Sequence, residues 1–171
     1  MTTAGVAHRM RHSLLMPPEI IIRRVTVADI PTLIHHRRMM WWDMGRQNTA
    51  ALDQMEIAAQ HYFSAAVPDG SYCGFVAANE VGEIVGGAGV VVSPWPGSFD
   101  QKLPRRAMIL NMYVERPYRR RGIARALMET MIAWCKQEEF AYVGLHASDE
   151  GRPLYEKLGF RPTNEMRLEL K

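Results

Sequence analysis

Cysteine is scarce in this 171-residue sequence, which contains only Cys73 and Cys135. The two residues do not form a C-x-x-C pair, and no histidine pair matches them in a zinc-binding pattern. A disulfide framework and a structural zinc site are therefore excluded as the basis of the fold. We expect both cysteines to be reduced thiols, in the core or on the surface of a cytoplasmic protein.

Long apolar runs are also missing, and neither sign of charge dominates. No stretch approaches the roughly 18 consecutive apolar residues that predict a membrane-spanning helix. Hydrophobic residues make up 47% and charged residues 23% of the chain, and the formal net charge is only +3. This length and composition predict one globular domain that is large enough to bury a core. Much of the positive charge is concentrated between residues 116 and 125, so binding of polyanions by the whole surface is weakly supported.

Acidic residues are missing from the first 18 positions, MTTAGVAHRMRHSLLMPP, which carry two arginines. This composition is faintly similar to that of a transit peptide. No apolar segment or small-residue cleavage site follows, so a secretory signal is not predicted. We interpret residues 1–18 as a flexible leader that ends at two prolines, and residues 19–171 as a single domain without internal repeats.

Strand and helix patterns alternate through the rest of the chain. Runs of β-branched and apolar residues predict strands at 20–25, 72–78, 83–92, 107–114, 141–146 and 166–170. Apolar residues at helical spacing predict helices at 30–44, 50–66, 123–134 and 154–158. The second and third strands are close enough to form a hairpin, and the apolar run 107–114 indicates a central strand buried on both faces. This order is typical of an α/β fold rather than of a helical bundle or a β-sandwich.

The segment ERPYRRRGIARAL, residues 115–127, lies where the central strand is followed by an amphipathic helix. A basic run of this kind is compatible with binding to nucleic acid or to a small phosphorylated ligand. The first amides of a helix bind anions, and the small side chains of Gly122 and Ala124 leave those amides accessible to a phosphate. Neighbouring arginines add charge-assisted hydrogen bonds. No Walker loop or G-x-G-x-x-G fingerprint is present, so we predict another kind of phosphate site.

Two motifs resemble signatures of the GNAT superfamily of N-acetyltransferases. Arg119, Gly122 and Ala124 occupy the fixed positions of its R/Q-x-x-G-x-G/A motif, and PLYEKLGF at residues 153–160 is similar to its C-terminal segment. The resemblance implies a three-layer α/β fold with a mixed sheet of six or seven strands and helices on both faces. It also implies an N-acetyltransferase that uses acetyl-CoA as its co-substrate and needs no metal.

The same resemblance assigns residues to the cofactor. The pantetheine arm would lie where the sheet splays, between the strands that end near Val114 and His146. Its contacts would be the backbone of Met112, Tyr113 and Val114. The pyrophosphate would rest on the turn and the start of the helix, which comprise Arg119, Arg120, Arg121, Gly122, Ile123, Ala124 and Arg125. Ser148 stands where the family often has asparagine, and Gly151 stands where it often has alanine, so a contact from this loop, donated by Ser148, is a weaker expectation.

Acyl transfer to an amine needs a group that accepts a proton. An alkyl amine with a pKa near 10.4 is neutral in only roughly one molecule in two thousand at pH 7. Some relatives use a glutamate on the fourth strand, but Met108 and Leu110 occupy that stretch here. His146 is the candidate base, although a structural histidine is an equally good interpretation. Asn111, the lone polar residue of its strand, is expected to make a structural hydrogen bond.

Tyr155 occupies the family's position for the general acid that protonates the departing thiolate, and a core tyrosine is the alternative interpretation. With Tyr155 as the acid, the protein would transfer the acetyl group directly to a primary amine of a small molecule or peptide. Two other functions remain open, a non-catalytic CoA-binding sensor of the same fold and a nucleic-acid-binding domain. The second is disfavoured because the sequence shows no aromatic platform or base-reading helix.

Aromatic residues mark the segments that we expect to select the acceptor. They are Trp41 and Trp42, followed by Asp43 and Met44, at the end of the first helix, and Trp95 and Phe99 in the loop 93–103. Such rings stack on a substrate or hold a cation, and they equally suit a core or a dimer interface. Amino acids, antibiotics, polyamines and protein N-termini all remain candidate acceptors. We expect a homodimer that binds neither nucleic acid nor membrane.

Overall fold

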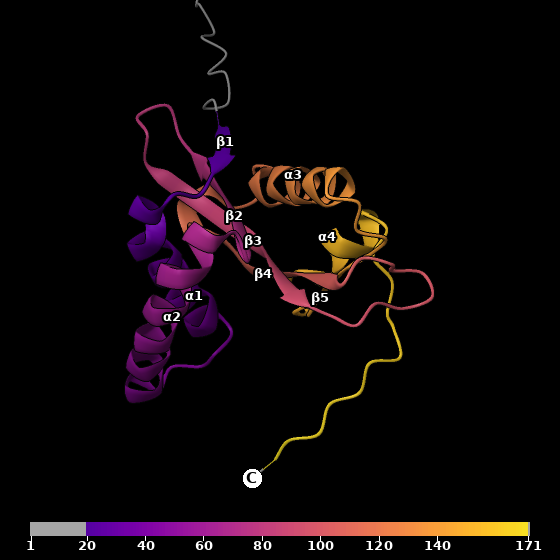
Figure 1. Cartoon of the computed structure of the whole chain (residues 1–171). Coiled ribbons are helices and arrows are strands. Elements are labelled where there is room, and N and C mark those ends of the chain that lie inside the picture. The colour runs from indigo at the N-terminus through magenta and orange to yellow at the C-terminus, as the bar shows by residue number, and fades with distance from the viewer. Residues whose placement is uncertain (1–19, 171) are drawn as a thin grey trace, which may run out of the picture.

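The computed structural model describes residues 20–170, so the expected leader at 1–18 lies outside the described residues. Five strands form one sheet in the order β1-β2-β3-β4-β5 (Figure 1). The strands are β1 (Ile21–Arg24), β2 (Tyr72–Ala78), β3 (Ile84–Pro94), β4 (Arg105–Val114) and β5 (Val143–Leu145). Neighbouring strands are antiparallel except β4 and β5, which are parallel. The sheet is therefore mixed, as the sequence predicts.

Helices cover both faces of the sheet, which gives the expected three layers. They are α1 (Ile30–Asp43), α2 (Thr49–Asp69), α3 (Ile123–Gln137) and α4 (Arg152–Lys157), with short 3-10 turns at Val27–Asp29 and Arg116–Tyr118. The helices α1 and α2 lie side by side on one face, and α3 and α4 lie on the other (Figure 1). Within residues 20–170, no helix is long and apolar enough to cross a bilayer.

Each face of the sheet has its own hydrophobic core. The larger core packs α3 and α4 against the strands, and Leu127 and Met131 are completely buried in it. Both cysteines lie in this core as buried free thiols, in agreement with the sequence-based prediction. The smaller core packs α1 and α2 against β2 and contains Phe63 and Tyr72, whose rings meet edge to face.

Polar side chains precede the first two helices, and a glycine ends the second. Asp29, which precedes α1, accepts two hydrogen bonds of 2.8 Å from Arg23 and one of 2.8 Å from the backbone amide of Thr26. The bonds from Arg23 contribute most to lowering the pKa of Asp29 to about 2. The side chain of Asn48 accepts a backbone hydrogen bond from the first turn of α2, and the helix ends at Gly70 with φ 81°.

The C-terminal segment differs from the prediction of a sixth strand. Residues 166–170 form no strand, and Met166, Leu168 and Leu170 are 82–94% exposed. The segment leaves the body of the molecule beyond α4 (Figure 1). An alternating sequence forms a strand only where an edge offers pairing over its length. The edge strand β5 is only three residues long, shorter than the predicted 141–146, and it offers little to pair with.

β4 also differs from the prediction, because it is not buried on both faces along its whole length. Ala107 and Ile109 lie in the larger core, whereas Met108 and Leu110 are half-buried and belong to neither core. The helix α1 packs against the second half of β4, and α2 packs against β2. One face of the first half of β4 is therefore partly open on the side of α1 and α2.

Candidate functional site

The turn between β4 and α3 contains two residues in the left-handed region. Arg120 has φ 63°, and Gly122, the N-cap of α3, has φ 83°. Amides in such a turn, together with the first amides of a helix, form a concavity that binds anions. A β-carbon on Gly122 would have no atom within 4 Å, so the space around it is open. Ile123 is buried in the larger core and Ala124 packs against it, which fixes the start of α3.

Two arginines of this region are held by one carboxylate. Arg119 donates from Nε to the carbonyl of Val114 at 2.8 Å, and its guanidinium also bonds to Asp43 at the end of α1. Arg116 donates to the other oxygen of Asp43 at 2.6 Å. Burial opposes ionisation of Asp43, but the two arginines outweigh it and lower its pKa. Asp43, expected to help select the acceptor, thus ties α1 to the turn.

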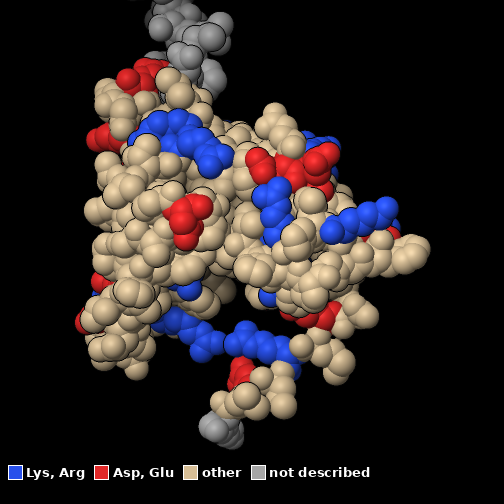
Figure 2. All heavy atoms as spheres, viewed as in Figure 1, with Lys and Arg blue, Asp and Glu red and all other residues tan. Residues whose placement is uncertain are grey.

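The other arginines of the turn are more accessible. Arg120 and Arg121 are exposed and form no ion pair within the described chain, and the guanidinium of Arg121 lies 5.3 Å from the ring centre of Tyr118. Arg125 pairs with Glu129 at 2.8 Å, one turn further along α3. Basic and acidic side chains are interspersed over the face shown in Figure 2, so no continuous basic field covers it. Arg120 and Arg121 are therefore the side chains most available to a phosphate.

An irregularity in β4 lies next to the turn. The register between β3 and β4 shifts between Gly87 and Gly89, and Asn111 on the opposite strand has φ 59°. Asn111 Oδ1 accepts a hydrogen bond from Arg37 of α1, and its Nδ2 donates to Tyr72 Oη at 3.5 Å. The expected structural hydrogen bond of Asn111 is present. Bulges of this kind redirect a strand and are frequent beside active sites.

Met112, Tyr113 and Val114 follow the bulge. Met112 packs against the larger core. The ring of Tyr113 lies 5.2 Å from that of His36 and 5.3 Å from the guanidinium of Arg119. The carbonyl of Val114 already accepts a bond from Arg119, although a carbonyl has a second lone pair for another donor. The predicted contacts of these three residues with a pantetheine arm stay predictions.

Tyr155 lies in α4 and points into the larger core, with only 8% of its surface exposed. Within residues 20–170 its hydroxyl makes no hydrogen bond, and burial raises its pKa. A β-carbon on Gly151 would lie 2.8 Å from Cε2 and 3.0 Å from Oη of Tyr155. The ring therefore occupies space that only a glycine leaves free. A buried phenol without a partner retains its proton at neutral pH and is suited to donate it.

His146 and Ser148 follow β5. His146 is exposed, and its Nε2 lies 4.0 Å from Oε1 of Glu165 in the C-terminal segment. Ser148 Oγ accepts a hydrogen bond from the amide of Gly151 at 3.2 Å, which stabilises the turn before α4. The assignments of His146 as base and of Ser148 as a cofactor contact stay predictions.

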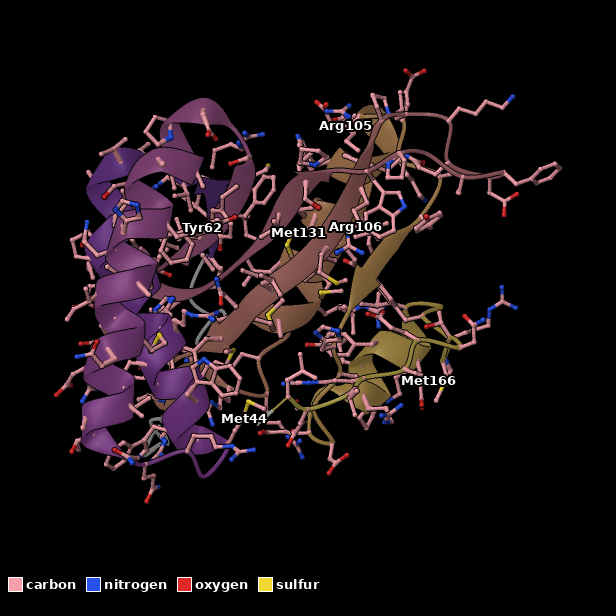
Figure 3. The ribbon with its side chains drawn as sticks, turned by 60° about the horizontal axis from the view of Figure 1, so that its bottom comes forward. Met44, Tyr62, Arg105, Arg106, Met131 and Met166 are labelled. Atoms are coloured by element: carbon pink, nitrogen blue, oxygen red, sulfur yellow. The ribbon has the colours of Figure 1, made fainter. Side chains whose placement is uncertain are left out.

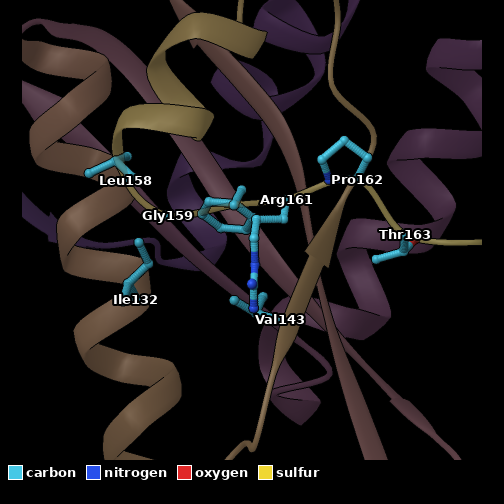
Figure 4. Close-up of a pocket in the computed structure, with 8 residues that line it drawn as sticks. Ile132, Val143, Leu158, Gly159, Arg161, Pro162 and Thr163 are labelled. Carbon is cyan, nitrogen blue, oxygen red and sulfur yellow. The ribbon is translucent and has the colours of Figure 1, made fainter.

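Two cavities lie near these elements. One, of about 540 Å³, is lined by Ile132 of α3, Val143 of β5 and residues 158–163 (Figure 4). The other, of about 310 Å³, is lined by Arg121 and Tyr118 and by residues of the connection between β2 and β3. Neither contains the bulge or Tyr155. The backbone geometry of the turn, rather than the larger cavity, therefore defines the candidate site.

The segments expected to select the acceptor contain two cation–aromatic contacts. The guanidinium of Arg37 lies 5.9 Å from the ring centre of Trp41, whose Nε1 is buried without a hydrogen-bond partner in the described chain. The guanidinium of Arg106 lies 4.0 Å from the ring centre of Trp95. In Figure 3, Arg106 lies over the sheet, between the helices α1 and α2 and the C-terminal segment. Phe99 is 97% exposed and contributes little to this surface.

Arg37 is not among the site residues predicted from the sequence. A signal was present, because Arg37 stands four residues after Leu33 and four before Trp41, on the apolar stripe of α1. A charged residue on a stripe that faces the sheet needs a partner or a role.

Comparisons with known proteins agree with this architecture. Residues 36–160 match the acetyltransferase (GNAT) family. A GCN5-related N-acetyltransferase from Ralstonia eutropha is 31% identical, with 89% of this chain and 99% of that chain covered and a TM-score of 0.83. A predicted acetyltransferase from Clostridium acetobutylicum, solved with acetyl-CoA, is 26% identical, with 90% and 96% covered and a TM-score of 0.80. An aminoglycoside N-acetyltransferase in complex with CoA shares the fold at 17% identity, with 92% and 98% covered and a TM-score of 0.67. No curated protein matches the sequence.

Proposed function

The chain belongs to the GNAT family of acetyltransferases, and on this premise we propose that it transfers the acetyl group of acetyl-CoA to a primary amine of a small molecule or peptide. The observation that carries the proposal is the turn at Arg120 and Gly122, whose amides stand at the start of α3 beside open space. The Clostridium acetobutylicum neighbour solved with acetyl-CoA supports the same co-substrate. The proposed reaction uses no metal.

In this proposal the turn binds the pyrophosphate through its amides and through the exposed side chains of Arg120 and Arg121. Arg119 has a different task, because its bonds to Val114 and Asp43 hold the turn in place. Fixing the amides before the ligand arrives reduces the entropy lost on binding. The backbone of residues 112–114 would hold the arm that carries the acetyl group.

The transfer forms one bond and breaks one bond. The neutral amine attacks the acetyl carbon, the carbon–sulfur bond breaks, and the thiolate leaves with the bonding electron pair. Tyr155 donates its proton to that thiolate, and its phenol suits the role because burial of the residue raises its pKa and keeps it protonated. The nitrogen also loses a proton, for which His146 is the proposed acceptor, acting directly or through water.

Gly122→Glu tests the cofactor site, because a carboxylate at this position would repel the phosphates. Calorimetry should show that acetyl-CoA affinity falls by at least about a hundredfold, as expected for an unpaired like charge in an anion site. Gly70→Glu is the matched control, since Gly70 has nearly the same φ, 81°, and no atom near its missing β-carbon, but lies between α2 and β2. Unchanged affinity in a folded Gly122→Glu variant would rule out this site.

Release of free thiol in the presence of an amine library tests the reaction itself. Thiol release that depends on one class of amine supports transferase activity. Tight acetyl-CoA binding without thiol release for any amine would instead identify a CoA-binding sensor. Salt-sensitive DNA or RNA binding that acetyl-CoA fails to displace, measured by gel shift at low salt, would assign the arginines to nucleic acid.

We further propose a cytoplasmic homodimer that binds neither nucleic acid nor membrane. The buried free thiols support a reducing compartment, and the exposed Phe99 supports an interface at the loop 93–103. Sedimentation of the full chain at several concentrations tests the dimer, and Phe99→Ser should shift it toward the monomer.

A further inference from the structure

Arg37 is one of two arginines of the described chain that are half-buried and have no acidic partner. The other, Arg106, donates a hydrogen bond to Ser93 Oγ and lies over the ring of Trp95. Carboxylates pair with six other arginines, namely Arg23, Arg38, Arg105, Arg116, Arg119 and Arg125. Within residues 20–170, Arg37 bonds only to the amide oxygen of Asn111 and lies near the ring of Trp41. A guanidinium has five N–H donors, so most of those of Arg37 remain available.

The surroundings of Arg37 do not compensate its charge. Burial lowers its pKa, and only the phenols of Tyr72 and Tyr62 act in the opposite direction. A half-buried cation surrounded by neutral groups is costly to keep in the free protein. An anion that binds beside Arg37 would form the charge-assisted hydrogen bonds that no acidic side chain of the described residues forms with it. The site therefore favours a ligand with a planar acidic group.

The position of Arg37 relates this anion site to the proposed reaction. Its partner Asn111 forms the bulge of β4, directly before the Met112–Val114 segment that would hold the pantetheine arm. Along the same strand, Met108 and Leu110 are half-buried and belong to neither core. The bulge thus has a guanidinium beside it and a partly open apolar surface leading away from it.

We infer that the acceptor is a free α-amino acid with an apolar side chain, whose α-carboxylate binds Arg37. The inference rests on the proposed function, since it names the acceptor of that reaction. In an α-amino acid the amine and the carboxylate are attached to one carbon, so a carboxylate on Arg37 places the amine beside the bulge. The side chain then extends over Met108 and Leu110.

Other classes of acceptor fit this surface less well. Polyamines and aminoglycosides are polycations, which Arg37 would repel, and no carboxylate of residues 20–170 bonds to Arg37 or Asn111 to attract them. A peptide N-terminus has an amide in place of the α-carboxylate and leaves the guanidinium unpaired. The carboxylate next to the amine is the feature that distinguishes these classes.

Three amines with the same side chain test the inference: L-leucine, L-leucinamide and 3-methylbutylamine. The unmodified protein should acetylate leucine with a kcat/KM about ten- to a hundredfold higher than the other two, as expected for a charge-assisted bidentate contact. The amine of leucinamide is less basic than that of leucine, so a larger fraction of it is neutral and able to attack at neutral pH. A higher kcat/KM for leucine could therefore not be explained by the intrinsic reactivity of the two amines. Equal or faster turnover of leucinamide would overturn the inference while leaving acetyl transfer intact.

Variants of Arg37 locate the preference. Arg37→Gln should lower kcat/KM for leucine about ten- to a hundredfold and leave that for leucinamide nearly unchanged, and Arg37→Lys should retain part of the preference. Arg38→Gln is the matched control on the same helix, because Arg38 pairs with Asp53 and Glu56 and should not affect the ratio. An unchanged leucine-to-leucinamide ratio in Arg37→Gln would overturn the inference.

Two measurements keep the outcomes separate. Acetyl-CoA affinity, measured by calorimetry, shows whether each Arg37 variant is folded. If Arg37→Gln is not folded, the inference is decided by the three amines tested on the unmodified protein and by Arg37→Lys. If no amine releases thiol, the proposed function fails, but NMR titration of the CoA-saturated protein with leucine and leucinamide still decides the inference. Selective binding of leucine that Arg37→Lys weakens would support the carboxylate site, and absence of such binding would overturn it.

Discussion

Arg119 and Arg37 both hydrogen-bond to β4, but only Arg119 has a counter-ion within residues 20–170. Arg119 bonds to the carbonyl of Val114 and to the carboxylate of Asp43. Arg37 bonds to the amide of Asn111, and no carboxylate of the described chain pairs with it. A buried charge that the protein neutralises itself contributes to the framework, whereas one left without a partner is available to a ligand. The comparison distinguishes the residues that shape the site from those that act in it.

The same distinction applies to other groups of the molecule. Asp29 receives two hydrogen bonds from Arg23 and belongs to the framework that positions α1. Tyr155 is buried with a hydroxyl that has no partner in residues 20–170, so it belongs with Arg37. Three variants test whether the grouping holds.

The largest effect is expected from Tyr155→Phe, which keeps the ring and its packing but removes the proton. General acid catalysis typically contributes about 10²- to 10⁴-fold, and a thiolate is already a tolerable leaving group, so kcat should fall within or just below that range. Acetyl-CoA affinity should remain nearly intact. Tyr142→Phe, at a 48% exposed tyrosine, is the matched control. If Tyr155→Phe turns over at the rate of the unmodified protein under conditions where chemistry limits turnover, Tyr155 supports the structure and does not act as the acid.

A smaller effect is expected from the pH dependence of folding. Asp29 has a pKa of about 2 in the folded protein against 3.8 for the free group, so its contribution is full above about pH 4 and is lost as pH falls toward 2. The shift corresponds to about 2 kcal/mol of stability. Urea unfolding of the parent and of Asp29→Asn should differ by about this amount at pH 6 and converge near pH 2. A constant difference across that range would show that Asp29 acts through packing instead.

The smallest effect is expected from Asp43→Asn. This change removes the carboxylate that pairs with Arg116 and Arg119, so that both lose their counter-ion. Losing the carboxylate should loosen the turn, and the acetyl-CoA Kd measured by calorimetry should rise by about three- to tenfold as preorganisation is lost. Asp53→Asn removes a carboxylate that pairs with Arg38 elsewhere on α1 and should leave the Kd unchanged. Tighter binding in Asp43→Asn would show that this carboxylate competes with the phosphates for the arginines.

Features that depend on neighbouring residues could be predicted from the sequence. The sequence predicts β2 with its observed bounds, Tyr72–Ala78, because turn residues flank an apolar run. It also predicts the turn at 119–124, since a glycine and small residues follow a strand and precede an amphipathic helix. Family membership likewise follows from short motifs and is confirmed by the match over residues 36–160.

Features that join distant segments could not be predicted in this way. The bulge at Asn111 arises from pairing with β3 near Gly87 and Gly89, and its contact with Arg37 spans 74 positions. The bond between Arg119 and Asp43 spans 76 positions. The alternating residues 166–170 predict a strand, but whether they form one depends on the short edge at β5. The hydrophobic periodicity and the secondary-structure propensity of a segment contain no information about which distant residues it contacts.

The packing of Tyr155 on Gly151 also determines how this sequence tolerates variation. Even alanine at position 151 would have to displace the ring, because a methyl group would lie 2.8 Å from Cε2. In a pooled variant screen scored separately for abundance and for acetylation, position 151 should therefore score as an active-site position although it reacts with nothing. The position of the proposed acid thus depends on a residue that has no side chain of its own.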